Sequence, residues 1–155
     1  MKIALYREVV RDMFRAGGAG VRLIAEGADP PAEKIRHFVQ SFVELGDERP
    51  WFPTLMLREI AEGAPHLDTE TLNLMRDVFV QFAGIVTAGQ ASGAFRPVHP
   101  VLAYMSVIGP LLLNAARERA GSRRDRAHLP MFIAVSHQEL SQHLQETAVR
   151  MLKGQ

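Results

Sequence analysis

The chain has no cysteine among its 155 residues, and it has no marked excess of either charge. Without thiols it forms no disulfide bond and offers no thiolate ligand to a metal. Lys and Arg number 18 against 17 Asp and Glu, which leaves a net charge of +1. A surface that neutralises several DNA phosphates is far more basic. We therefore expect that this chain alone does not bind nucleic acid.

Long apolar runs are also lacking. The N-terminal stretch Lys2–Phe14 mixes charged with apolar residues and has no uncharged core of the kind found in signal peptides. The uncharged and largely apolar run Val101–Ala116 contains a proline and is shorter than the roughly 20 residues that span a bilayer. We expect a cytoplasmic protein without a membrane segment. Its length fits a single domain over residues 1–155.

Apolar residues recur with helical spacing along the chain, and Gly, Pro and capping residues separate the segments. The expected helices run from Lys2 to Glu26, from Asp29 or Pro30 through Gly46, from Pro50 to Gly63, from Asp68 to Gly93, from Pro100 to about Glu118, and from a start between Leu129 and Ser136 onward. Pro110 should kink the fifth of these near Ser106–Gly109. No segment alternates usefully with the spacing of a strand. The sequence therefore predicts an all-α fold, a bundle of about six helices.

Two short stretches stand out within this pattern. The segment AGGAG, from Ala16 to Gly20, lies inside the first expected helix, where each glycine lowers stability by up to about 1 kcal/mol relative to alanine. We expect a kink there, or a backbone that a neighbour or a ligand approaches closely. In the stretch GAFRPVHP, Gly93 suits a left-handed C-cap, Phe95 can fold back onto the finished helix, and Pro100 suits the first turn of the next helix.

Residues with catalytic or metal-binding chemistry are scattered. Glu139 and His143 have an i, i+4 spacing that suits two metal ligands, and a solvated helix face explains the pair better. No nucleophile elbow, zinc-protease or phosphate-loop pattern occurs. We expect no enzyme activity, no catalytic residue, no metal and no cofactor. The arginines between Arg117 and Arg126 alternate with acids, which favours a solvated loop over a site for an anionic partner.

Seven aromatic and methionine side chains form a possible ligand pocket: Trp51, Phe52, Met56, Phe79, Phe82, Tyr104 and Met105. Such a set suits an apolar or aromatic small molecule. Tyr104 is the first choice to orient it through one hydrogen bond, ahead of Asn114 and His37. Taken alone, the pattern fits a filled core at least as well.

The last two expected helices suggest a homodimer. The stretch from Val101 to Ala116 is apolar on more sides than one core face requires. We expect these helices to form an intermolecular four-helix bundle, with an interface that includes Leu112, Leu140, Leu144 and Met151.

Three stretches, in this order, resemble regulators of the tetracycline-repressor (TetR) family. KIALYREVVRDMF (Lys2–Phe14) resembles the first helix of their regulatory domain, and FVQSFVELGDERPWFPTLMLREI (Phe38–Ile60) resembles the next two helices. GAFRPVHPVLAYMSVIGPLLL (Gly93–Leu113) resembles the corner that opens the family's penultimate helix. His99 stands where the family has an aspartate, so we expect a weaker N-cap before Pro100.

The resemblance implies a fold and a function. The fold is that of the TetR C-terminal domain, and the function is effector sensing and dimerisation in a transcriptional regulator. A small molecule would tilt the first helix and so release operator DNA from the helix-turn-helix domains of a dimer. The resemblance implies that this sequence begins where the helix-turn-helix domain would end. A different class remains open, a helical homodimeric interaction module without a small-molecule site. A third is a small enzyme that uses a histidine such as His37.

Overall fold

Six α-helices and one short 3-10 turn, η1, make up the computed structural model, which describes residues 2–126 and 128–154 and contains no strand within them. The elements are α1 (Lys2–Glu26), α2 (Pro31–Glu48), α3 (Trp51–Ala61), α4 (Thr69–Ala91), α5 (Pro100–Gly121), η1 (Pro130–Phe132) and α6 (His137–Lys153). The predicted all-α fold and the number of helices are confirmed. The predicted end of α5 was one turn early, because the helix continues past Glu118 to Gly121.

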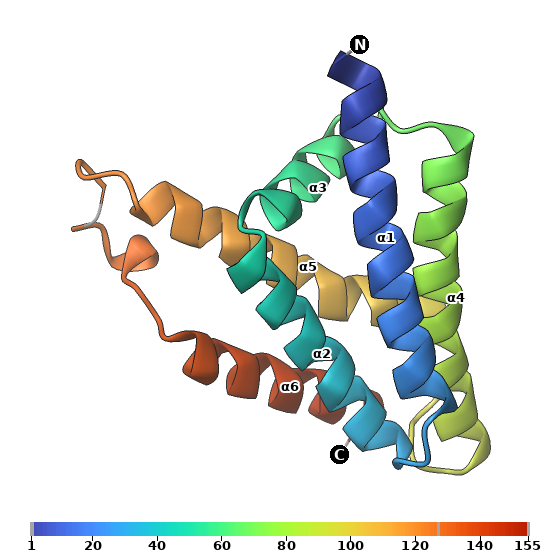
Figure 1. Cartoon of the computed structure of the whole chain (residues 1–155). Helices are drawn as coiled ribbons and strands as arrows, with labels where there is room; N and C mark the ends of the chain where they lie inside the picture. Colours follow the sequence, from blue (N-terminus) through green and yellow to red (C-terminus); the bar gives the residue numbers. More distant parts are fainter. Residues whose placement is uncertain (1, 127, 155) are drawn as a thin grey trace.

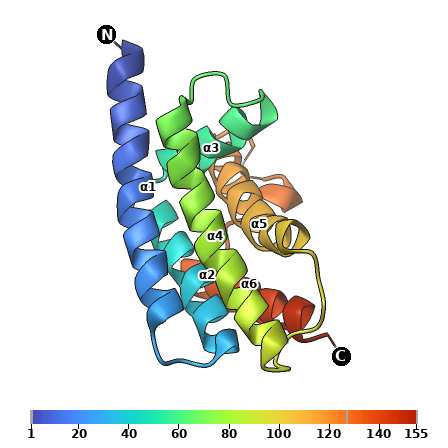
Figure 2. The same ribbon diagram turned by 90° about the vertical axis from the view of Figure 1, so that its right-hand side faces the viewer.

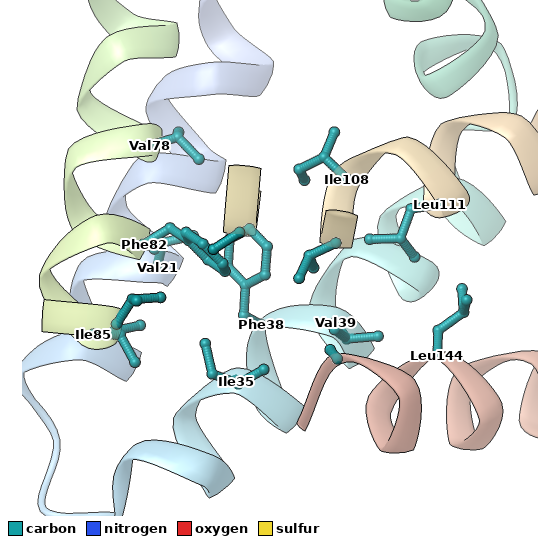
Figure 3. Packing of buried hydrophobic residues seen from close by; sticks show 14 of the residues in the cluster. Val21, Ile35, Phe38, Val39, Val78, Phe82, Ile85, Ile108, Leu111 and Leu144 are labelled. Carbon is teal, nitrogen blue, oxygen red and sulfur yellow. The ribbon is translucent and has the colours of Figure 1, made fainter. Parts of the chain in front are cut away.

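The helices pack around one shared hydrophobic core. Figures 1 and 2 show α1 alongside α4, while α2 lies between this pair and α6. α5 crosses the bundle and packs against α3, α4 and α6. Phe38 of α2 and Phe82 of α4 lie in the middle of the core, with ring centroids 5.1 Å apart (Figure 3). Both side chains are fully buried, so α2 and α4 are held together by aromatic packing at their centres.

Most helix ends follow the capping residues of the sequence. The Asp68 carboxylate accepts hydrogen bonds from the Thr71 backbone N–H at 3.0 Å and from its hydroxyl at 2.7 Å, which confirms the predicted N-cap of α4. Ser136 caps α6 in the same way by accepting from the Glu139 N–H. Pro31 occupies the first turn of α2, where its missing N–H removes no helical bond.

The AGGAG segment does not interrupt α1, which is helical from Lys2 to Glu26. Gly18 meets α4, because a Cβ atom at this position would lie 3.8 Å from Cγ2 of Val78. Gly17 and Gly20 meet no neighbour, since a Cβ atom at either would have no atom within 4 Å. The distance at Gly18 is that of an ordinary van der Waals contact, and the other two glycines face open space, so none of the three is closely approached by a neighbour.

The corner between α4 and α5 forms as predicted at three positions. Gly93 has a φ of 80°, Phe95 is buried against α4, and Pro100 begins α5. His99, from which a weaker N-cap is expected, does provide a side-chain cap. Its Nδ1 accepts a hydrogen bond from the Val101 N–H at 3.2 Å, so the imidazole caps α5 in place of a carboxylate.

α5 has apolar side chains on its buried face and on its free face. Ala103, Val107, Ile108, Leu111 and Leu112 lie in the core. Val101, Leu102, Met105 and Leu113 are exposed. By length and composition alone, α5 is the one described helix that meets the requirements of a membrane span, a test that core helices of soluble proteins also pass. Its contacts with α3, α4 and α6 account for the buried face.

Candidate functional site

A cavity of about 350 Å³ lies between α1, α2 and the beginning of α3. Its volume falls within the range of roughly 300–1,000 Å³ that is usual for small-molecule sites. Its apolar walls are Met13, Phe14, Ala16, Gly17, Gly20 and Val21 from α1, Phe38, Phe42 and Leu45 from α2, Phe52 from α3 and Val78 from α4.

Helical spacing brings the walls together. On α2, Phe38, Phe42 and Leu45 follow one another by four and three positions, so one face of the helix lines the cavity. On α1, Gly17 and Gly20 are three positions apart and share the face that meets it. Phe14 and Phe52 close the end toward α3, with ring centroids 5.5 Å apart in an edge-to-face arrangement.

The polar groups of the cavity lie at its mouth. Ser41, Glu44, Glu48 and Arg49 contribute to the lining, and all four are exposed to solvent. The interior surface consists of hydrocarbon and aromatic rings. The site therefore suits a ligand with an apolar body. Any polar substituent of such a ligand would lie at the mouth of the cavity.

The structure places only Phe52, among the seven predicted pocket residues, in the lining of this cavity. Trp51 packs edge-to-face on Phe52, with centroids 5.8 Å apart, and lines a separate and more open apolar groove with Leu5 and Val9 of α1. Met56 is buried in the core, and Met105 is exposed on α5.

Phe79, Phe82 and Tyr104 form an aromatic cluster of their own. The Tyr104 ring lies 5.2 Å from that of Phe79 and 5.3 Å from that of Phe82, both edge-to-face. Burial raises the pKa of the Tyr104 phenol to about 12. These rings pack directly against one another and not around the cavity.

The other two residues considered for orienting a ligand have local partners. His37 is half-exposed and lies 3.5 Å from Asp29. Asn114 donates its side-chain N–H to the Pro110 carbonyl at 2.8 Å, one turn earlier in α5. Neither lines the cavity between α1 and α2.

The sequence analysis did not assign Phe14, Phe38 or Phe42 to a site. One signal was available, because the AGGAG segment suggested a backbone that a ligand approaches. The position of the glycine-bearing face of α1 relative to Phe42 depends on the angle at which α1 and α2 cross, and no sequence pattern gives this crossing angle.

Polar contacts hold the N-terminal half of α1 to α3 and to the loop that follows it. The Tyr6 hydroxyl donates to the buried Glu59 carboxylate at 2.7 Å, and His66 Nδ1 lies 2.7 Å from the same oxygen. Burial opposes the charge of Glu59, but the hydrogen bonds from Tyr6 and His66 outweigh it and lower the pKa of this carboxyl. Burial and the bond to Glu59 raise the pKa of the Tyr6 phenol.

A second contact fixes α1 to the beginning of α4. The Arg11 guanidinium pairs with Asp68, and Arg15 reaches Glu70 at 2.9 Å. The bonds from Thr71 and Arg11 hold the pKa of Asp68 well below its usual range. In the described part of α1, these contacts all lie N-terminal to the glycines that line the cavity.

The residues predicted for a dimer interface differ in exposure. Leu112 and Leu144 are buried within the single chain, and Leu140 and Met151 are partly buried. The exposed residues of α6 are mostly polar, among them Gln142, Glu146 and Arg150. The exposed apolar surface near these helices belongs instead to α5 and to the η1 segment, where Met131 and Ile133 are exposed.

Comparison with known proteins agrees with the architecture. A family model described as "Tetracyclin repressor-like, C-terminal domain" matches residues 31–123. The chain belongs to the TetR family. The match covers α2 to α5, and so includes the α2 wall of the cavity and the corner at Gly93. No curated protein and no solved structure matches the chain.

Membership of the TetR family places the chain in a family of regulatory domains, which is a non-enzyme kind of family. Within the described residues, no group of three or more histidine or acidic side chains is arranged to hold a metal. The i, i+4 pair Glu139 and His143 instead lines a groove between α5 and α6 with Asn114 and Arg117.

Proposed function

We propose that this TetR-family domain senses a small-molecule effector, dimerises, and couples effector binding to the release of operator DNA. The observation that carries the proposal is the cavity of about 350 Å³ between α1 and α2, with its phenylalanine and glycine walls. An apolar or aromatic effector fits this lining. Operator contact belongs to the helix-turn-helix domain of such regulators, in agreement with the near-neutral charge of this chain.

The position of the cavity gives a route for coupling. A ligand there touches α1 on one side and α2 on the other, so it binds most tightly at one separation of the two helices. Because α1 is anchored through Tyr6, Arg11 and Arg15 near its N-terminal half, a change of separation at Gly17 and Gly20 reorients the helix about those contacts. A ligand with different affinities for two orientations shifts their populations by the difference in binding free energy.

The apolar free face of α5 supports dimerisation. Leu102, Met105 and Leu113 are exposed there, while the opposite face of α5 is already in the core. A second copy that packs α5 against α5 would bury these side chains and explain why both faces are apolar. The predicted residues Leu140 and Met151 would then lie at the edge of the interface.

Binding of a panel of apolar and aromatic compounds tests the sensing role. Trp51 is the single tryptophan and packs on Phe52, which lines the cavity, so its fluorescence reports on this site. We expect some compounds to change the fluorescence saturably and to raise the melting temperature. Phe42→Ala should alter the affinity because Phe42 lines the cavity, whereas Phe79→Ala, in the separate cluster, should leave it unchanged. If no compound binds, the alternative of an interaction module without a small-molecule site is favoured.

A further inference from the structure

The α1 wall of the cavity carries Met13, Phe14 and Val21, but at two positions it has no side chain. Gly17 and Gly20 both line it, and a Cβ atom at either would meet no atom within 4 Å. On the other walls stand the rings of Phe38, Phe42 and Phe52.

The fold itself does not require glycine at these two positions. The glycines with positive φ are Gly63, Gly93 and Gly154, so Gly17 and Gly20 have helical backbones that alanine adopts equally well. Neither is approached by another helix, whereas Gly18 faces Val78 at an ordinary contact distance. Alanine at both positions would fit the free chain and stabilise α1. The two glycines therefore weaken the helix. What they provide is a part of the cavity wall at which the backbone of α1 is bare.

We infer that the ligand of this cavity presents a planar aromatic group, which lies flat along the backbone of α1 at Gly17 and Gly20. The inference rests on the proposed sensing function and specifies the shape of the effector. A flat ring can approach a helix backbone closely only where no Cβ intervenes. Its edges and opposite face then meet Phe38 and Phe42 in the offset or edge-to-face arrangements that aromatic rings prefer. A puckered saturated ring of the same size is thicker and loses this fit.

Two probes with the same carbon skeleton test the shape. 2-Naphthol is planar, whereas decahydro-2-naphthol is puckered, and each carries one hydroxyl group. We expect 2-naphthol to bind the wild-type protein at least about tenfold more tightly, a difference of about 1.4 kcal/mol, as measured by calorimetry. A site that selects ligands by hydrophobicity alone would bind the saturated compound more tightly. Equal or tighter binding of decahydro-2-naphthol overturns the inference, and so does the absence of 2-naphthol binding.

Substitution of the glycines tests the position of the ring. Gly17→Ala and Gly20→Ala should each raise the melting temperature of the free protein by roughly 2–4 °C, because alanine favours the helix. Each should also weaken 2-naphthol binding by about tenfold, since the methyl group occupies the place of the ring. Gly84→Ala is the matched control. Gly84 lies inside α4 with no atom within 4 Å of an added Cβ and does not line the cavity. This variant should be stabilised equally and bind 2-naphthol as the wild type does.

The results separate this inference from the proposed function. Unchanged 2-naphthol affinity in Gly17→Ala and Gly20→Ala would overturn the flat placement, even if compounds from the panel bind in a way that depends on Phe42. Failure of every compound in the panel would instead reject the sensing function, and the inference with it.

Discussion

The ring of Phe95 lies directly over Gly89, two residues before the end of α4. A Cβ atom at Gly89 would lie 2.8 Å from Cγ of Phe95 and closer still to two other ring atoms. The Phe95 N–H also donates to the Gly89 carbonyl at 3.0 Å. The glycine therefore makes room for the aromatic residue that closes the α4–α5 corner.

Gly89→Ala should destabilise the domain, because the methyl group displaces the buried ring. Overpacking of this kind typically lowers the free energy of unfolding by about 1–3 kcal/mol. Gly84→Ala, in the same helix but facing open space, should raise it by up to about 1 kcal/mol. Urea unfolding of both variants measures the contrast. Equal stability of the two variants would show that Phe95 moves aside freely.

The imidazole cap of α5 makes a second prediction. His99→Asp should raise the free energy of unfolding by about 0.3–1 kcal/mol, because a carboxylate accepts the same N–H bond and also interacts favourably with the helix dipole. His99→Ala should lower it, since the Val101 N–H loses its side-chain acceptor. Thermal unfolding at neutral pH compares the three proteins. If His99→Ala is as stable as the wild type, the observed hydrogen bond contributes nothing to the cap.

The Glu59 carboxylate should make stability depend on acid pH. Its pKa in the folded chain is lowered from the ordinary value of 4.5, so its contribution is fully present above that value and is lost as the pH falls through the folded pKa. The stability difference between the wild type and Glu59→Gln should therefore be largest near pH 7 and shrink steadily below about pH 4.5. Urea unfolding at several pH values measures this difference.

Two tyrosine variants serve as controls for this network. Tyr6→Phe removes a hydrogen bond to a charged group and should lower the free energy of unfolding by roughly 1.5–3 kcal/mol at pH 7, with a smaller effect in acid. Tyr104→Phe alters a phenol that packs among aromatic rings, and its effect should not vary between pH 3 and pH 7. A constant effect of Tyr6→Phe over the same range would contradict the role of the Glu59 charge.

Leu113→Arg should separate a dimer without unfolding the chain. Leu113 is 64% exposed on the free face of α5, so a charge there would be buried only in an interface. Leu23→Arg is a matched control, since Leu23 is 75% exposed at the far end of α1. We expect sedimentation to give a dimer for the wild type and for Leu23→Arg, and a folded monomer for Leu113→Arg. A dimeric Leu113→Arg protein would contradict an interface through α5.

Local rules predicted the helices well because their signals lie within a few residues. Asp68, Gly93 and Pro100 have conformations or hydrogen bonds that depend on their own neighbourhood, and each was placed correctly. Local signals say less about which side of a helix is buried. On α4, the apolar Leu72 is exposed, whereas the polar Thr71 is buried. Which side of an amphipathic helix meets a neighbour depends on the bundle as a whole.

The site was harder to predict for the same reason. The sequence identified the correct kind of lining, aromatic and apolar, but grouped Phe79 and Tyr104 with Phe52. In the structure, the first two pack against each other, and Phe52 instead meets Phe14 across the end of the cavity. Side chains far apart in sequence form a cavity only through the angles at which their helices cross, and the hydrophobic pattern contains no information on those angles.

Arg96 connects the α4–α5 corner to the end of the chain. Its backbone N–H donates to the Leu152 carbonyl at 2.8 Å, and its Nε donates to the Met151 carbonyl at 2.7 Å, so one residue binds two terminal carbonyl groups of α6. During translation, Arg96 emerges long before its partners are synthesised. Until they follow, the corner lacks both acceptors, and the part of the core that receives Val149 and Leu152 stays uncovered. Closure of this loop of 55 residues is therefore a folding step that the first five helices cannot complete by themselves.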